Sequence, residues 1–292
     1  MQGKAPLFSL SLVGAKKTIN LNNGMYTIHT DQLCSEVSKT DLIIFPAVEG
    51  DMATAVNRNK VLIDWATQQY HKGTELASLC AGAFLLAATG LLTGKKCSTH
   101  WAAQNEFRRM YPGVEVVSDS IITEEKQIYS SGGSQSYWNL LLHLVEKYVN
   151  RDAAIITSKY FAVDIDRESQ AVFAMFKGQM DHEDKEILKA QQYIEKNISE
   201  RISIDDLSKW VAVSRRSFER RFKQATCNTV LEYIQRVKIE AAKRKFESGR
   251  KHINEVMYEV GYGDIQAFRD VFKRITGLTP LEYRKKYNKL TI

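Results

Sequence analysis

Residues 214–233, SRRSFERRFKQATCNTVLEY, recur fifty residues later as residues 264–283, DIQAFRDVFKRITGLTPLEY. The two copies agree at eight of twenty positions, where unrelated sequences would agree at about one. The shared residues are Phe218/Phe268, Phe222/Phe272, Lys223/Lys273, Thr226/Thr276, Thr229/Thr279, Leu231/Leu281, Glu232/Glu282 and Tyr233/Tyr283. A repeat of this length is typical of a supersecondary unit used twice. The last hundred residues are therefore predicted to hold two copies of one helical motif.

The first copy has the pattern of a helix-turn-helix. Ser203 is a favourable N-cap, and apolar residues follow it at helical spacing. After a short break, Ser214 is expected to cap a second helix that runs to about Ala225. The buried face of that helix should hold Phe218 and Phe222. A polar stripe at spacings of three and four lies on another face and consists of Arg216, Glu219, Arg220 and Lys223.

The second copy begins near Ile253 and turns at residues 261–263, where glycine can adopt positive φ. Asp264 is expected to cap its second helix, which should bury Phe268 and Phe272. The outward stripe of this helix consists of Gln266, Arg269 and Lys273. Both copies therefore present a polar stripe on their second helix.

Residues 231–246 are predicted to form one long helix that holds the two units at a fixed separation. Two recognition helices on such a bar can enter successive major grooves of DNA, about 34 Å apart. Arginine can bond guanine, glutamine can pair with adenine, glutamate can accept from cytosine, and lysines can meet phosphates. The alternative is a helical bundle with ordinary surface charges. The capped, repeated motif with a basic stripe favours double-stranded DNA as the partner.

Residues 186–287 resemble the DNA-binding domain of the AraC/XylS transcription regulators. The resemblance rests on residues 203–207, 213–222, 259–264 and 277–284, which read SIDDL, VSRRSFERRF, EVGYGD and GLTPLEYR. It implies base contacts from Arg216, Glu219 and Arg220 in the first copy, with Arg215 and Lys223 beside them. In the second copy it implies contacts from Ile265, Gln266, Arg269 and Asp270, with Lys273 beside them.

Asp270 departs in sign from the group that many members of that family carry at this position. Its role is left open between reading a cytosine and pairing with Arg269 or Arg274. The first copy, with Arg215, Arg216, Arg220 and Arg221, is the more basic one. We therefore expect it to supply most of the DNA affinity, and the second copy to supply more of the discrimination.

The charge distribution agrees with a DNA-binding second half. The 292 residues carry a net charge of +7, and this length is typical of about two domains. Residues 186–292 hold 23 Lys and Arg against 14 Asp and Glu, whereas residues 1–185 hold 18 against 20. A nearly neutral first part and a basic second part favour a polyanionic partner for residues 186–292. A solvated basic surface would have the same composition.

The four cysteines have neither disulfide-like nor zinc-like spacing, which favours a reducing compartment and predicts no metal and no cofactor. They are Cys34, Cys80, Cys97 and Cys227. Residues 1–6 are polar and short, so no signal peptide is expected. No apolar run reaches the roughly 18 residues that a membrane span needs. The expectation is a cytoplasmic protein with no membrane partner.

The first half alternates strand-like and helix-like segments, which predicts an α/β domain with a parallel sheet flanked by helices, as in flavodoxin-like folds. Strands are expected at residues 8–13, 42–45, 76–79, 114–117 and 128–130. Helices are expected at residues 61–70, 82–92, 105–110 and 136–149.

The most informative local feature of this half is Ser78-Leu79-Cys80-Ala81-Gly82, between a strand and a helix. It has the pattern of a nucleophile elbow, with Ser78 in place of the first glycine. A thiol at a helix N-terminus is favoured as thiolate. Cys80 is therefore a candidate nucleophile, ligand contact or oxidation sensor. It could equally be a small buried residue.

This half resembles the PfpI-type, class I glutamine amidotransferase-like domains. The resemblance rests on residues 78–82, 83–94, 99–101 and 131–133, which read SLCAG, AFLLAATGLLTG, THW and SGG. Together the two halves resemble the GlxA-type transcription regulators, in which such a domain precedes an AraC-type reader. The resemblance implies a domain 1–165 that senses a ligand and dimerises, a linker 166–185, and a DNA-binding domain 186–292.

Three departures from that family argue against catalysis. Ala81 stands where the enzymes often have a histidine, and the loop 46–50 lacks the usual paired glycines. The chain is also expected to start after the family's first strand, so a glutamate that the enzymes use would have no counterpart. His100 is either a base for Cys80 or a structural or ligand-contacting residue. The candidate ligand-binding residues are Cys80, Ala81, His100 and Gly133.

The leading hypothesis is thus a transcription regulator that is not an enzyme and has no catalytic residue. Its expected partners are DNA, a small-molecule effector, RNA polymerase and a second copy bound through the first domain. The alternatives are a cysteine-dependent amidase or hydrolase and a thiol redox sensor, both of which would use Cys80.

Overall fold

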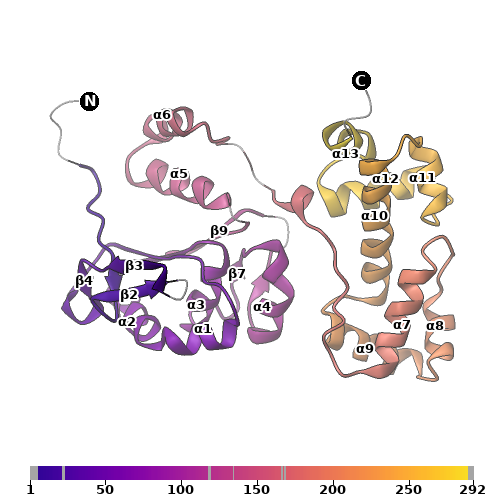
Figure 1. The fold of residues 1–292 in the computed structure, drawn as a ribbon, viewed down its shortest axis with the longest axis horizontal. Coiled ribbons are helices and arrows are strands. Elements are labelled where there is room, and N and C mark those ends of the chain that lie inside the picture. The colour runs from indigo at the N-terminus through magenta and orange to yellow at the C-terminus, as the bar shows by residue number, and fades with distance from the viewer. Residues whose placement is uncertain are drawn as a thin grey trace. The chain divides into compact units, whose positions relative to one another are not determined.

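The computed structural model describes residues 6–21, 24–117, 120–133, 135–165, 167 and 169–288. The chain divides into two compact units, Met1–Gln170 and Ala171–Ile292. Figure 1 shows an α/β arrangement in the first unit and helices alone in the second. The predicted combination of an α/β domain and an all-α domain is confirmed.

The first unit is built on a four-stranded sheet in the order β5-β6-β10-β9. Strands β5 (Leu42–Phe45), β6 (Glu75–Ser78) and β10 (Ile128–Ser131) are parallel, and β9 (Ile122–Glu125) runs antiparallel to β10. In register, Ile43 lies opposite Leu76, and Leu76 lies opposite Ile128. The predicted strands at 42–45, 76–79 and 128–130 are confirmed to within a residue.

Alternate residues of these strands enter separate cores, because successive side chains of a strand point to opposite faces. Ile43, Phe45 and Leu76 pack with one set of helices. That set consists of α1 (Met52–Arg58), α2 (Lys60–His71), α3 (Ala83–Ala88) and α4 (Gln104–Met110). Ala77 and Tyr129 face the other way, onto α5 (Ser136–Tyr148), and α6 (Arg151–Phe161) packs on α5. Helices therefore cover both faces of the sheet, as predicted.

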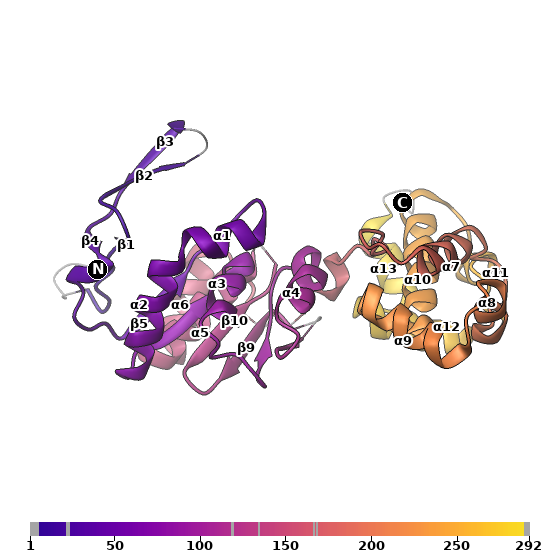
Figure 2. The ribbon, with the colours of Figure 1, turned by 90° about the horizontal axis from the view of Figure 1, so that it is seen from below.

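The first thirty residues depart from the prediction. The strand expected at residues 8–13 forms only as β1 (Val13–Gly14), paired with β4 (Gln32–Leu33). Residues 7–12 are exposed and belong to no strand, although the Leu12 carbonyl accepts from the amides of Asp31 and Gln32. Strands β2 (Thr18–Leu21) and β3 (Tyr26–His29) make a hairpin that stands away from the α/β layers of its unit (Figure 2).

Short elements complete the first unit. Strand β7 (Lys96–Cys97) pairs with β8 (Glu115–Val116). Single turns of 3₁₀ helix occupy η2 (Cys34–Glu36), η3 (Cys80–Gly82) and η4 (Trp101–Ala103).

The second unit contains two helix-turn-helix pairs on one long helix. Its helices are α7 (Lys185–Lys196), α8 (Ile204–Trp210), α9 (Arg215–Thr226), α10 (Val230–Ser248), α11 (Ile253–Glu259), α12 (Ile265–Thr276) and α13 (Pro280–Tyr287). Helix α10 supplies Val230 and Tyr233 to a core with α8 and α9. It supplies Ile239 and Phe246 to a second core with α11 and α12. The predicted connecting helix is therefore confirmed as a rigid part of both cores.

Most of the expected linker belongs to the second unit. The Phe176 ring packs on Tyr233 with centroids 5.2 Å apart, and its amide donates to Glu240. The buried Lys243 ammonium donates to the Ala174 carbonyl at 2.6 Å. The turn η5 (Ala171–Phe173) precedes these contacts. The sequence suggested a linker because this stretch is polar, but Ala174 and Phe176 within it are anchored on α10.

Within the described residues, no helix is both long enough and apolar enough to cross a membrane.

Candidate nucleic-acid interface

Six of the eight repeated residues have the same structural role in both copies, either as buried core residues or at the ends of helices. Phe218 and Phe222 are fully buried, and the Phe222 ring meets Tyr233 edge-on at 5.2 Å. Phe272 and Tyr283 meet in the same way at 5.5 Å. Edge-to-face aromatic pairs of this kind stabilise a core beyond the area that they bury. The repeat therefore places the same aromatic cluster under each polar stripe.

The repeated threonines and glutamates end one helix and start the next. The Thr226 hydroxyl donates to the Phe222 carbonyl, and the Thr276 hydroxyl to the Phe272 carbonyl, each at 2.8 Å. Thr229 and Glu232 form a capping box at the start of α10. Thr279 and Glu282 form the matching box of α13, and such boxes satisfy two backbone donors at a helix N-terminus.

The other two repeated residues, a lysine and a leucine, are exposed in both copies. Lys223 and Lys273 lie on the polar stripes. Leu231 is 55% exposed and Leu281 is 44% exposed, each in the first turn of its helix. An exposed leucine contributes little to a core, and this one recurs on the helix that follows each polar stripe. The sequence analysis used it only as evidence of repetition.

The outward residues of α9 line one groove of about 420 Å³. The groove brings together Arg216, Glu219, Arg220, Lys223, Ile204, Thr229, Val230 and Leu231. Helix α9 forms because its apolar residues recur at helical spacing and Ser214 occupies the N-cap, although the Ser214 side chain makes no capping bond. Four of the five residues predicted in the first copy thus lie side by side.

Two of the arginines in the first copy are held by intramolecular ion pairs. Arg215 binds Asp205 at 2.9 Å and Glu219 at 3.1 Å. Arg221 binds Asp184 at 2.6 Å and Glu186 at 2.7 Å. Its hydrogen bond to Asp184 lowers the pKa of that carboxyl and raises the pKa of the guanidinium. Arg221 therefore fastens α7 to α9.

The second stripe is exposed on α12. Gln266, Arg269, Asp270 and Lys273 all lie at the surface. The Gln266 amide donates to Asp270 at 2.8 Å, which adds a partner for Asp270 that the sequence did not suggest. Arg274 instead bonds Gln235 at 2.6 Å. Ile265 is half-buried against the second core, so only part of its side chain is exposed.

The turns of the two pairs differ in sequence and agree in backbone conformation. Ala212 has φ of 55° and Gly261 has φ of 73°, both left-handed. The buried Lys238 ammonium on α10 donates to the Glu200 carbonyl at 2.8 Å and to the Gly261 carbonyl at 3.2 Å. Burial lowers the pKa of Lys238. This lysine ties the second turn to the loop before α8, so the two pairs are joined by more than α10.

In the first unit, the elbow predicted at Cys80 has the expected backbone geometry. Cys80 has φ of 54°, in the left-handed region. A Cβ at Gly82 would lie 2.6 Å from the Phe45 carbonyl oxygen, so only glycine fits there. Burial raises the pKa of the Cys80 thiol, which opposes the thiolate that its place before a helix suggested. Helix α3 is only six residues long, and its dipole is correspondingly small.

The other ligand-binding candidates converge near this elbow. Thr99 donates to the Cys80 carbonyl at 3.0 Å. A Cβ at Gly133 would lie 3.8 Å from the His100 ring. His100 Nδ1 accepts from the Ala102 amide at 3.1 Å, and burial lowers the pKa of His100. Ala81 is buried beside Cys80. Among the described residues, no hydrogen bond joins His100 to Cys80.

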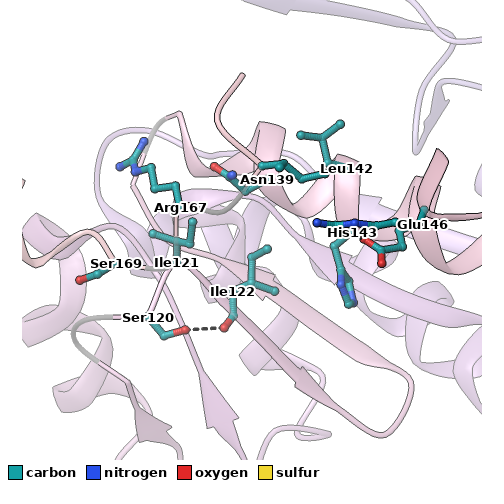
Figure 3. Close-up of a pocket in the computed structure, with 11 residues that line it drawn as sticks. Ser120, Ile121, Ile122, Asn139, Leu142, His143, Glu146, Arg167 and Ser169 are labelled. Atoms are coloured by element: carbon teal, nitrogen blue, oxygen red, sulfur yellow. Dashed lines mark hydrogen bonds and ion pairs between the residues drawn. The ribbon is translucent and has the colours of Figure 1, made fainter. Parts of the chain in front are cut away.

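A cavity of about 530 Å³ opens elsewhere in the first unit (Figure 3). Figure 3 shows Arg167 at one end and His143 with Glu146 at the other, around Ile121 and Ile122. Glu146 binds Arg151 at 2.7 Å. The lining also includes Ser120, Asn139, Leu142, Ile165 and Ser169. None of the predicted ligand residues lines it, because it depends on tertiary packing of segments that carry no motif.

The described residues contain no cluster of metal-ligating side chains.

Both units are similar to known proteins. Residues 7–147 match the DJ-1/PfpI family, and residues 207–286 match a helix-turn-helix domain family. The HTH-type transcriptional regulator GbdR of Pseudomonas aeruginosa is 24% identical over 218 residues, covering 74% of this chain and 59% of GbdR. This chain thus spans about three fifths of the length of that relative.

Two further proteins resemble this chain. The HTH-type transcriptional regulator CdhR of Pseudomonas aeruginosa is 21% identical over 274 residues, covering 90% of this chain and 77% of CdhR. The crystal structure of a transcriptional regulator of the AraC-type DNA-binding class from Chromobacterium violaceum is 27% identical. It covers 36% of this chain and 93% of that structure, with a TM-score of 0.34.

Proposed function

We propose that this chain, which joins a DJ-1/PfpI-family domain to an AraC-type helix-turn-helix domain, is a sequence-specific DNA-binding transcription regulator. The observation that carries the proposal is the pair of exposed polar stripes on α9 and α12. Both stripes lie on helices packed on α10, which belongs to both cores. Because α10 holds both helices, α9 and α12 can enter successive major grooves of DNA at the same time.

Each stripe has residues suited to reading bases. In the first copy, Arg216 and Arg220 would bond guanine, Glu219 would accept from cytosine, and Lys223 would meet phosphate. Arg215 would reach DNA only by exchanging its bonds to Asp205 and Glu219. Leu231 would add an apolar contact, such as one to a thymine methyl group.

In the second copy, Gln266 and Asp270 would act as one hydrogen-bonded unit beside Arg269, and Lys273 would meet phosphate. Ile265 would place its exposed part against the base edges, and Leu281 would repeat the role of Leu231. The different residues at equivalent positions would let the two copies read different bases.

The first unit would sense a small-molecule effector and dimerise, and it would not catalyse. The raised pKa of Cys80 and the absence of a hydrogen bond from His100 both disfavour a nucleophile. Effector binding is proposed at Cys80, Ala81, His100 and Gly133. The cavity of Figure 3 is a second place of suitable size. No cofactor is required, RNA polymerase would be a further partner, and the protein would work in the cytoplasm.

The test is selection of binding sites from random DNA, followed by footprinting upstream of neighbouring genes. We expect an enriched sequence with two segments separated by about one helical turn. Absence of both a sequence preference and a protected site would contradict the proposal. Hydrogen exchange with and without an effector would then show whether the elbow or the cavity is protected.

A thiol sensor is the second candidate, and the half-buried, partly accessible position of Cys80 favours it. In that case mild peroxide would change the DNA affinity of the wild type and leave that of Cys80→Ala unchanged. A cysteine-dependent hydrolase would instead show turnover that Cys80→Ala abolishes.

A further inference from the structure

The buried Gln170 side chain is bonded to three backbone segments of the first unit. Gln170 is 1% exposed. Its Oε1 accepts from the Gly133 amide at 2.8 Å, and its Nε2 donates to the Thr99 carbonyl at 3.0 Å and to the Ser120 carbonyl at 3.4 Å. A Cβ at Gly132 would lie 2.6 Å from Nε2. The surrounding backbone is therefore fitted closely to this one amide group.

Two of these backbone partners lie at the proposed effector site. Gly133 is one of its residues. Thr99 directly precedes His100, and its hydroxyl donates to the Cys80 carbonyl at 3.0 Å. A buried amide has no water to bond in place of a lost partner, so loss of a bond here is costly. An effector that shifts the backbone at Gly133 or Thr99 would therefore disturb the bonds of Gln170.

The next residues of the chain are anchored on the second unit. Val172 packs against the core that contains α11 and α12. The buried Lys243 ammonium on α10 holds the Ala174 carbonyl at 2.6 Å. The Phe176 ring packs edge-on against Tyr233, also on α10. Since α10 belongs to both helix-turn-helix cores, these contacts reach the support of both polar stripes.

The connection between the two sets of contacts is short. Gln170 and Ala174 are four positions apart in the sequence, and four residues span at most about 14 Å. A long flexible linker would let its two ends move independently. Residues 170–176, here called the strap, are bonded at both ends and have no such slack. A rearrangement at one end of the strap is therefore passed to the other.

We propose that Gln170 is the positioning residue through which the proposed effector site and the second unit influence each other. A change in its hydrogen bonds moves the strap, and the strap acts on α10, which supports α9 and α12. Coupling between two binding sites is reciprocal, so DNA bound to α9 and α12 also acts on the bonds of Gln170. The inference rests on the proposed function as a DNA-binding regulator and names the residue that links its two units.

The experiment is hydrogen exchange of the full chain with and without saturating duplex DNA that carries the selected operator. The Gly133 amide is a direct probe, because it donates to Gln170. In the wild type, we expect the operator to change the exchange rate of this amide by about twofold or more. Gln170→Met keeps a side chain of similar length and loses the amide group. In this variant the operator should leave exchange at Gly133 unchanged.

Gln69→Met is the matched control in the same unit. Gln69 is 2% exposed, and its amide also donates to backbone carbonyls, at Val37 and Ser38. These bonds involve no residue of the strap. The control should lose stability because buried hydrogen bonds are removed, but it should retain the effect of the operator at Gly133. Loss of that effect in Gln69→Met as well would indicate general destabilisation and would overturn the inference.

The other outcomes separate this inference from the proposed function. Fluorescence anisotropy measures operator binding independently, and a wild type that binds no operator would overturn the proposed function. A bound operator with unchanged exchange at Gly133, or an effect that survives in Gln170→Met, would overturn the inference alone. Circular dichroism monitors folding. If Gln170→Met unfolds, Phe176→Leu, which weakens the other end of the strap, decides by the same criterion.

Discussion

Arg216 and Arg221 lie on the same helix and have opposite surroundings. Arg216 faces the groove beside α10, whereas Arg221 is bound to Asp184 and Glu186. The sequence shows two arginines within a basic run, and nothing local separates them. The partners of Arg221, Asp184 and Glu186, lie at the start of α7, thirty-five or more residues away in the sequence. The role of a charged residue here thus depends on which side of α9 it occupies.

Replacing Arg216 or Arg269 by alanine should weaken operator binding by about 1–3 kcal/mol and relax the preference at one base pair each. The physical reason is loss of a guanidinium that would bond a base edge. Fluorescence anisotropy with operators altered at single positions measures both effects. Arg221→Ala should lower stability and leave base preference unchanged. Equal loss of affinity on all sequences would show that these arginines contact phosphates only.

The Arg221–Asp184 pair makes stability depend on pH. The pKa of Asp184 is lowered in the folded protein, so the pair stabilises the fold above the ordinary carboxyl pKa of 3.8. That contribution is lost as pH falls through the lowered value. Urea unfolding should show Arg221→Gln less stable than the wild type by about 1 kcal/mol at pH 7. The difference should shrink progressively below pH 3.8. A difference that grew on acidification would have the wrong sign.

At the scale of elements, the two helix-turn-helix pairs are built alike but with different turn residues. Helices α9 and α12 correspond at an offset of fifty, whereas α8 and α11 correspond at an offset of forty-nine. The second turn is therefore one residue longer. The left-handed positions are Ala212 and Cys227 in the first copy and Gly261 and Gly277 in the second. The first copy carries backbone strain that glycine avoids in the second.

Ala212→Gly should therefore stabilise the second unit by about 0.5–1 kcal/mol, because relief of the left-handed strain exceeds the added backbone entropy of glycine. Gly261→Ala should destabilise by more than about 1 kcal/mol. Its Cβ would also lie 2.8 Å from the Ile198 carbonyl oxygen. Urea unfolding measures the change in the free energy of unfolding for both variants. Ala267→Gly, inside α12, is the control and should destabilise. If Ala267→Gly also stabilised the protein, relief of left-handed strain would not explain the effect of Ala212→Gly.

At the scale of the whole molecule, the two stripes differ in net charge. The exposed groove residues Arg216, Glu219, Arg220 and Lys223 sum to +2, and the equivalent residues of α12 sum to +1. Ion pairs held by Arg215 and Arg221 remove much of the additional positive charge that the sequence suggests. The first copy is still the more basic, so the expected division between affinity and discrimination stands as a prediction.

Two matched double substitutions test that division. Arg216→Ala with Arg220→Ala, and Arg269→Ala with Lys273→Ala, each remove two positive charges. We expect the first pair to lower the slope of log affinity against log salt by up to about 2. The second pair should lower the slope less and reduce the ratio of operator to random binding more. The division would be wrong if the second pair removed more of the salt-dependent binding.

The sequence by itself determined the two domain types, the helix-turn-helix repeat, the long connecting helix and the central strands. Each of these follows from local periodicity, capping residues and turn chemistry, which act over a few residues. The elbow backbone at Cys80 was predictable for the same reason. The thiol's raised pKa was not, because desolvation depends on what packs around it.

Only the tertiary structure decided the features that join distant segments. It placed Arg221 in an ion pair, anchored Ala174 and Phe176 on α10, half-buried Ile265 and opened the cavity beside α5. It also bonded the buried Gln170 amide to backbone groups of distant segments. A local pattern shows which residues can be buried or paired. Which partners they meet depends on where the rest of the chain packs.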